Sequence, residues 1–196
     1  MKSHIIAITG GIGSGKSVVC QILNNYGYQI YNCDINAKTL MDNSISIKSA
    51  LSNELSPTVI NNDGSIYRKI LSDIVFNDKD KLNILNKIVH FYVKEDIIQW
   101  IKENTSNLPP SKLFIETAIL YQSGINKIVD EVWEITASEE TRINRVIKRN
   151  GLSRTEVISR IKSQAFIPSK IHPKTKTIIN DSNKPILPQL IPLLET

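Results

Sequence analysis

Long apolar runs and cysteines are both scarce in this chain of 196 residues. No apolar stretch approaches the roughly 20 residues that span a bilayer, and the chain begins without a charged leader. Its two cysteines, Cys20 and Cys33, lie outside any C-x-x-C spacing and are expected as reduced thiols packed in the interior. The sequence therefore predicts a cytoplasmic protein with no membrane partner.

Several patterns typical of other function classes are also missing. The three histidines and two cysteines form no zinc-ligand cluster, and no nucleophile motif indicates acyl transfer. A guanine-binding Asn-Lys-x-Asp motif is absent, because Asn183-Lys184 continues with Pro185-Ile186. Aromatic residues amount to 6% of the chain, and they do not interleave with the basic residues as in a surface that stacks bases. No nucleic-acid partner is therefore expected.

Positive charge is concentrated in one part of the chain. The net charge is +5, and the segment from Ser138 to Lys176 alone holds ten Lys or Arg against three Glu. Such a segment is expected to face an anionic ligand, either nucleic acid or a polyphosphate. The ordinary alternative for a run of charge is a solvated helix face.

Two short basic helices are predicted inside this segment. The first covers about 139–150 and carries Arg142, Arg145 and Arg149 on one face. A capping box that opens at Ser153 starts the second. Two basic helices joined at a glycine are typical of a mobile lid that brings cations over a transferring phosphate.

A glycine-rich segment, residues 10–17, lies between the apolar run 5–8 and a helix-compatible stretch. It reads G-G-I-G-S-G-K-S and meets the phosphate-loop pattern G-x-x-x-x-G-K-[ST] in its required context. Lys16 is expected to reach the β- and γ-phosphates of ATP, and the Ser17 hydroxyl to ligate Mg²⁺. The nucleotide-binding residues predicted here are Gly11, Ile12, Gly13, Ser14, Gly15, Lys16, Ser17 and Val18. The alternative is a glycine turn that binds nothing.

Short apolar runs separated by longer helical patterns predict an α/β fold with a parallel sheet. Five strands are expected, at 5–9, 28–33, 112–117, 131–136 and 176–180. A long helix is predicted over about 79–104, with Pro109-Pro110 forcing a break after it. Residues 40–107 exceed a simple crossover connection and are expected to form a helical insertion beside the sheet.

Two carboxylates end predicted strands, where ligands of open α/β sheets bind. Asp34 follows the second strand and is the candidate base that accepts the proton of an acceptor hydroxyl. Glu116 ends the third strand and is assigned to Mg²⁺ through water. Either acid could instead cap the following helix. Arg68 and His90 lie in the insertion, where the acceptor is expected, although an isolated histidine is by default a packed one.

Over nearly its whole length the chain resembles the dephospho-coenzyme A kinase family. The resemblance rests on the Thr-Gly-Gly-Ile-Gly core of the phosphate loop, on Asp34, on the segment from Glu116 to Gly124, and on scattered single positions. Those positions are Asp63, Gly64, Arg68, Val75, Phe76, His90, Arg145, Arg149, Gly151, Arg160, Gln164, Lys170, Ile178 and Asn180. The resemblance implies a phosphate-loop NTPase fold and transfer of the ATP γ-phosphate to the ribose 3′-hydroxyl of dephospho-coenzyme A, the last step of coenzyme A synthesis.

The resemblance also implies three parts. The nucleotide core would comprise 1–39, 108–137 and 176–196, the acceptor subdomain 40–107, and the lid 138–175. The catalytic residues expected are Lys16, Asp34 and Arg145, and Arg145 and Arg149 join the nucleotide contacts. The residues expected on the acceptor are Asp34, Arg68, His90 and Glu116. A monomer or a weak homo-oligomer is expected.

Five positions depart from the family pattern. Asn36 replaces the second acid of an Asp-Ala-Asp motif, so only Asp34 inherits a catalytic role. Phe91 replaces a proline, and Glu116 replaces a common aspartate. Lys174-Thr175 replaces an Ala-Asp pair. Three other functions are compatible with the sequence: a kinase for a nucleoside monophosphate or another small metabolite, a nucleotide-dependent switch, and a nucleic-acid binder.

Overall fold

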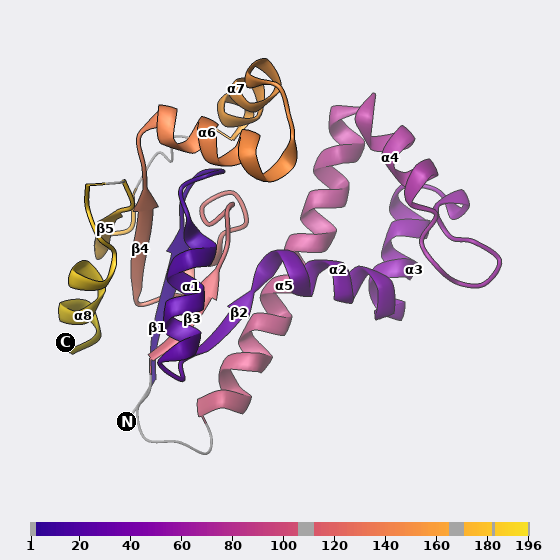
Figure 1. Ribbon diagram of the computed structural model, residues 1–196. Helices are drawn as coiled ribbons and strands as arrows, with labels where there is room; N and C mark the ends of the chain where they lie inside the picture. Colours follow the sequence, from indigo (N-terminus) through magenta and orange to yellow (C-terminus); the bar gives the residue numbers. More distant parts are fainter. Residues whose placement is uncertain (1–2, 106–111, 165–170, 182, 196) are drawn as a thin grey trace. The chain divides into compact units, whose positions relative to one another are not determined.

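Five short apolar segments form one sheet in the computed structural model, which describes residues 3–105, 112–164, 171–181 and 183–195. The strands are β1 His4–Thr9, β2 Gln29–Asn32, β3 Lys112–Glu116, β4 Glu131–Thr136 and β5 Thr175–Ile179. Their order across the sheet is β2-β3-β1-β4-β5 (Figure 1). Strand β1 is parallel to both β3 and β4, and β4 is parallel to β5. The predicted five-stranded parallel sheet is confirmed, and each strand end lies within one residue of its predicted place.

Strand β1 lies at the centre of the sheet, and five of its six residues are buried. Two helices cover one face of the sheet, α1 Lys16–Asn25 and α8 Leu187–Glu195. Leu23 of α1 and Leu190 of α8 pack there against a cluster that includes Phe114 and Trp133. The centre of the Phe114 ring lies 5.2 Å from that of Trp133, and both side chains are fully buried. This apolar layer holds the first turn of α1 at the end of β1.

The second strand ends one residue earlier than the sequence predicted. The sequence predicted Cys33 as the last residue of the second strand, but Cys33 opens helix α2, Cys33–Asn43. The physical reason is a cap, because the Asn32 side chain accepts a hydrogen bond of 2.9 Å from the Ile35 N–H. Asp34 consequently lies in the first turn of a helix and is not the residue that caps it. Cys20 and Cys33 are both buried free thiols, as predicted.

The chain divides into two compact units. Unit 1 comprises 1–31 and 104–196 and contains the phosphate loop, and unit 2 comprises 32–103. The helices of unit 2 are α2, α3 Ile45–Glu54, the short 3₁₀ helix η1 Pro57–Val59, α4 Arg68–Phe76 and nearly all of α5 Lys79–Thr105. Helix α5 confirms the long helix expected at 79–104. Pro109-Pro110 and Lys170 lie outside the described residues.

Unit 2 has an apolar core of its own. Ile47 and Leu51 of α3 are fully buried against Val59, Ile66 and Leu71. The segment that joins η1 to α4 makes a tight turn, in which the Gly64 N–H donates to the Asn61 carbonyl oxygen at 2.9 Å. The insertion is therefore a folded helical unit rather than a long loop, as its length predicted.

The two basic helices of unit 1 form where the sequence predicted them. Helix α6 covers Glu139–Asn150 and ends at Gly151, whose φ of 66° lies in the left-handed region. Helix α7, Arg154–Ser163, begins with the predicted capping box of Ser153 and Glu156. The two helices, called the α6–α7 pair below, share a buried cluster of Ile143, Val146, Val157 and Ile161. In Figure 1 the α6–α7 pair lies beyond the carboxyl end of β4.

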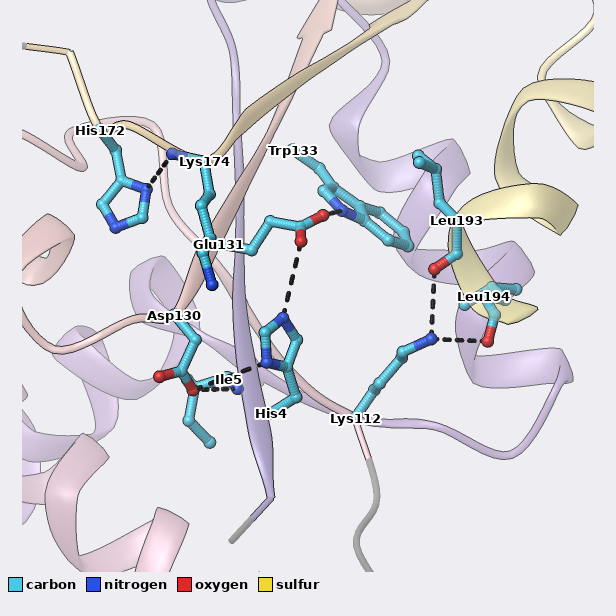
Figure 2. A network of polar contacts seen from close by, with 10 residues as sticks. All are labelled: His4, Ile5, Lys112, Asp130, Glu131, Trp133, His172, Lys174, Leu193 and Leu194. Atoms are coloured by element: carbon cyan, nitrogen blue, oxygen red, sulfur yellow. Dashed lines mark hydrogen bonds and ion pairs between the residues drawn. The ribbon is translucent and has the colours of Figure 1, made fainter. Parts of the chain in front are cut away.

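The opposite, amino-terminal end of the sheet is held by a polar network (Figure 2). Lys112, the first residue of β3, donates to the carbonyl oxygens of Leu193 at 3.2 Å and Leu194 at 2.6 Å, near the end of α8. The His4 imidazole lies 3.6 Å from Glu131, and Glu131 also accepts a hydrogen bond of 2.7 Å from the Trp133 indole. The side chains of Lys112, His4, Glu131 and Trp133 thus all contact protein, which suits a structural role.

No helix within the described ranges is long and apolar enough to cross a membrane.

Candidate active site

The phosphate loop connects the end of β1 to the start of α1, and its glycines are required by crowding as well as by backbone angles. Gly13 and Gly15 have φ values of 78° and 95°. A Cβ atom at Gly13 would lie 2.6 Å from the carbonyl oxygen of Arg142. A Cβ at Gly15 would collide with the carboxamide of Asn180. The loop is therefore a tight turn that only glycine can make at these positions.

The phosphate loop has hydrogen-bond donors that are available to an anion. Among the described residues, the backbone N–H groups of Gly13, Gly15 and Ser17 have no protein acceptor. The buried Ser14 hydroxyl also has no hydrogen-bond partner there. Several such donors at the start of a helix form the usual cradle for phosphate oxygens, because the N-terminal end of the helix dipole favours negative charge. The loop therefore fits the phosphates of a nucleotide.

Lys16 is the first residue of α1 and reaches back across the loop. Its Nζ atom donates a hydrogen bond of 2.7 Å to the carbonyl oxygen of Gly10. The ammonium group is thus held at the mouth of the loop, where a β- or γ-phosphate would meet it.

Glu116 lies beside the loop, because β3 pairs with β1 and the register places Glu116 opposite Ile8. One turn after Lys16, the thiol of Cys20 on α1 donates a hydrogen bond to the Glu116 carboxylate. Burial raises the pKa of Cys20, and the negative charge of Glu116 raises it further. Cys20 is therefore a neutral thiol at physiological pH, and its proton remains available to the acid next to it.

The oxygens of Ser17 and Glu116 are of the type that Mg²⁺ prefers. The Ser17 side chain is exposed and makes no hydrogen bond among the described residues. No group of three His, Cys, Asp or Glu side chains within those residues could hold a metal by itself. Such a sparse donor set fits Mg²⁺, because this ion keeps several waters and takes further ligands from bound phosphates.

The three arginines on one face of α6 contact different partners. The Arg142 Nε atom donates to the Ile12 carbonyl at 2.9 Å, and Arg145 lies 3.3 Å from the Asn180 side-chain oxygen. Arg149 is exposed and donates to the neighbouring Asn150 at 2.8 Å. Arg142 and Arg145 thus contact the site, whereas Arg149 hydrogen-bonds within its own helix. Arg142 was not among the site residues predicted from the sequence, although its position on the same face as Arg145 was the available signal.

Asn180 is a second site residue; in the sequence it was one of the positions that carry the family resemblance, and no site role was assigned to it. Its carboxamide is buried and donates a hydrogen bond of 2.8 Å to the Ser14 carbonyl. A hollow of about 570 Å³ lies beside it. The hollow is lined by Ile22, Arg145, Asn180, Asp181, Asn183, Lys184, Pro185, Ile186 and Leu187. Four apolar side chains and five polar or charged ones line it next to the loop, a mixture that suits the base of a nucleotide.

A second cavity, of about 420 Å³, lies between the first glycines of the loop, the segment after β3 and the α6–α7 pair. Its lining includes Gly10, Gly11, Tyr121, Gln122, Arg142 and Gln164. The Tyr121 hydroxyl accepts a hydrogen bond of 3.2 Å from the His172 N–H, which ties the segment after β3 to the approach to β5. This cavity therefore lies next to the phosphate loop.

The remaining predicted residues belong to unit 2. Asp34 is exposed in the first turn of α2, and Asn36 donates to the Asn32 carbonyl at 2.9 Å. Arg68, at the start of α4, pairs with Asp42 of α2. His90 is half-buried on α5, and burial lowers the pKa of its imidazole, so that it is neutral at physiological pH. Unit 2 thus offers a carboxylate, a guanidinium and a neutral imidazole.

The family model for dephospho-CoA kinase matches residues 4–185. A dephospho-CoA kinase of Dehalococcoides mccartyi is 39% identical over 82% of this chain and 80% of its own. The corresponding protein of Porphyromonas gingivalis is 36% identical over 97% of this chain and 93% of its own. A solved structure from Thermus thermophilus superposes with a TM-score of 0.72 at 29% identity, covering 93% of this chain and 91% of its own.

Proposed function

We propose that this chain, which belongs to the dephospho-CoA kinase family, transfers the γ-phosphate of ATP to the ribose 3′-hydroxyl of dephospho-CoA, giving coenzyme A and ADP. The observation that supports the ATP half is the phosphate loop, with N–H groups that have no protein acceptor among the described residues and with Lys16 at its mouth. The family match supports the acceptor half, because it extends over both compact units.

The nucleotide would lie along unit 1. Its phosphates would accept hydrogen bonds from the N–H groups of Gly13, Gly15 and Ser17, and its base would enter the hollow beside Asn180. Arg145 lines that hollow and lies next to the loop carbonyls, so it can contact both ends of the nucleotide. Arg149, whose Nε atom donates to Asn150, would contact the nucleotide through the remaining N–H groups of its guanidinium.

Mg²⁺ would be held by the Ser17 hydroxyl, and through water by Glu116. When bound, the ion would neutralise charge on the β- and γ-phosphate oxygens. Cys20 would keep the Glu116 carboxylate oriented through the thiol hydrogen bond. Lys16 would exchange the Gly10 carbonyl for a phosphate oxygen and stabilise the charge that moves toward the leaving ADP.

The acceptor would be held by unit 2. Asp34 would take the proton of the 3′-hydroxyl as the new P–O bond forms and the bond to ADP breaks. Arg68 would offer its guanidinium to an acceptor phosphate, and the neutral His90 would offer a hydrogen bond. We further propose that the protein acts in the cytoplasm as a monomer or weak homo-oligomer.

A substrate panel tests this function. Purified protein with Mg·ATP would be offered dephospho-CoA, AMP, CMP, adenosine, shikimate and gluconate, and ADP release would be measured together with the mass of the product. We expect coenzyme A from dephospho-CoA, with adenosine losing rate as well as affinity because it lacks the remote parts that position the hydroxyl. Phosphorylation of a nucleoside monophosphate, with none of dephospho-CoA, would contradict the proposal. ATP hydrolysis that no acceptor stimulates would point instead to a nucleotide-dependent switch.

A further inference from the structure

Ile12, the third residue of the phosphate loop, is joined to the α6–α7 pair by its side chain. It packs against the cluster that Ile143, Val146, Val157 and Ile161 form between the two helices. An apolar residue at the crest of a loop that binds charged phosphates thus has its partners in another part of unit 1. The contact fixes where the crest of the loop lies.

The backbone of Ile12 is joined to the same two helices. Its N–H donates a hydrogen bond of 2.8 Å to the side-chain oxygen of Gln164, at the end of α7. Its carbonyl oxygen accepts a hydrogen bond of 2.9 Å from the Nε atom of Arg142, on α6. The polar groups on both sides of one loop residue are therefore bound by side chains of the α6–α7 pair.

These two hydrogen bonds orient the peptide groups on either side of Ile12. In a trans peptide the C=O and the N–H point in opposite directions. Because Arg142 binds the Ile12 carbonyl, the Gly13 N–H of that peptide points away from Arg142, and it has no acceptor among the described residues. Because Gln164 binds the Ile12 N–H, the Gly11 carbonyl of that peptide points away from Gln164, and it accepts the Ser14 N–H at 3.1 Å. The bond from Arg142 thus directs the Gly13 N–H donor, and the bond to Gln164 directs the Gly11 carbonyl that closes the turn.

We propose that Arg142 and Gln164 are positioning residues that hold the phosphate loop ready for phosphate before a nucleotide arrives. This inference rests on the proposed function, in that the loop must bind ATP. Neither residue has to touch the nucleotide, because each acts through a peptide group of Ile12. Preorganisation of this kind raises affinity by removing the ordering cost from the binding step.

The experiment compares Gln164→Met, which keeps the length of the side chain but removes the acceptor, with Ser163→Ala. Ser163 is a matched control, because its hydroxyl bonds to the Arg160 carbonyl within α7 and not to the loop. Arg142→Met is compared with Lys148→Met, which removes an exposed charge from the same helix. Binding of Mg·ATP and of inorganic tripolyphosphate would be measured by calorimetry. Amide hydrogen exchange at Ile12 and Gly13 would be followed without nucleotide.

We expect Gln164→Met to lower the affinity for both ligands by about 2- to 10-fold, since one hydrogen bond contributes about 0.5–1.5 kcal/mol. The Ile12 amide should exchange faster in this variant. Arg142→Met should weaken binding further than Lys148→Met does, and Ser163→Ala should match the parent. Unchanged affinities in both test variants, relative to their controls, would overturn the inference, even with a lowered melting temperature. A parent protein that binds neither ligand would instead overturn the proposed function.

Discussion

The ammonium group of Lys16 donates a hydrogen bond of 2.7 Å to the carbonyl oxygen of Gly10, so the loop's cation is held by the loop's own first residue. A carbonyl oxygen is neutral, and a phosphate oxygen that replaces it would give a charge-assisted bond, which is about twice as strong. The Lys16 ammonium therefore binds the Gly10 carbonyl before ATP arrives and would form a stronger bond with a phosphate oxygen afterwards.

Replacing Lys16 by Ala should abolish turnover and leave a folded protein. The loss follows because the charge on the β- and γ-phosphates would no longer be balanced as the bond breaks. Part of the ATP affinity should survive, since the backbone N–H groups of the loop remain. Steady-state kinetics, calorimetry and a melting curve would test this, with Lys87→Ala on the exposed side of α5 as control. A folded Lys16→Ala protein with turnover near that of the parent would contradict the assignment of the loop.

Asp34→Asn should lower kcat by about 10²–10⁴, the usual cost of losing a general base. The change keeps the shape of the side chain but removes the proton acceptor, so ATP affinity should hardly change. Asp80→Asn is a matched control, because Asp80 also lies in the first turn of a helix. If the Asp34→Asn variant kept its kcat but lost ATP affinity, this carboxylate would belong to the nucleotide site and would not be the general base.

Arg145→Ala should lower kcat/KM by about 10- to 100-fold, in line with the loss of a hydrogen bond from a charged group. Arg145→Lys keeps the charge but loses the planar fork, so its effect should lie in between. We expect the double variant with Arg149→Ala to be worse than either single change, because Arg149 is predicted over the transferring phosphate when the α6–α7 pair closes. Full activity in the double variant would mean that both arginines form only a solvated helix face.

Asp181 makes stability depend on pH at the start of α6. Its carboxylate accepts hydrogen bonds from the Ser138 backbone N–H at 3.1 Å and from the Ser138 hydroxyl at 3.0 Å. These bonds hold the pKa of Asp181 below its ordinary value. A lowered pKa stabilises the fold above the pKa of the unfolded chain, and this stabilisation is lost as the pH falls through the folded value.

Asp181→Asn should therefore unfold at lower urea concentration than the parent at neutral pH, and the difference should shrink as the pH falls below the ordinary pKa of aspartate. Urea titrations across a series of acid buffers would measure the two midpoints. A difference that stayed constant over the acid range would show that the carboxylate charge is not what stabilises α6.

Lys112→Met should lower the free energy of unfolding by about 1–3 kcal/mol, because it removes a charged donor to two carbonyls at the end of α8 (Figure 2). Turnover per folded molecule should not change, since this network lies at the end of the sheet opposite to the phosphate loop. Urea unfolding with Lys148→Met as control would measure the effect. An equal loss in both variants would mean that the contact with α8 contributes nothing specific.

Local features of this protein could be predicted from its sequence. The glycine loop, the five strands, the long helix at Lys79–Thr105 and the capping box at Ser153 all depend on residues close together in the chain. Cys33 was misplaced because strand and helix patterns overlap there, and the Asn32 cap decides in favour of the helix. The sequence therefore identified Asp34 as a candidate general base, but it did not predict that Asp34 lies in the first turn of a helix.

Contacts between distant residues were decided only by the tertiary structure. Gln164 binds Ile12 across 152 positions, Arg142 binds Ile12 across 130, and Asn180 binds Ser14 across 166. Periodicity and spacing describe which face of an element is apolar, but not which other element packs against that face or which side chain reaches a given peptide group. The sequence by itself determined that a phosphate loop forms between β1 and α1, and only folding decided which side chains hold that loop in shape.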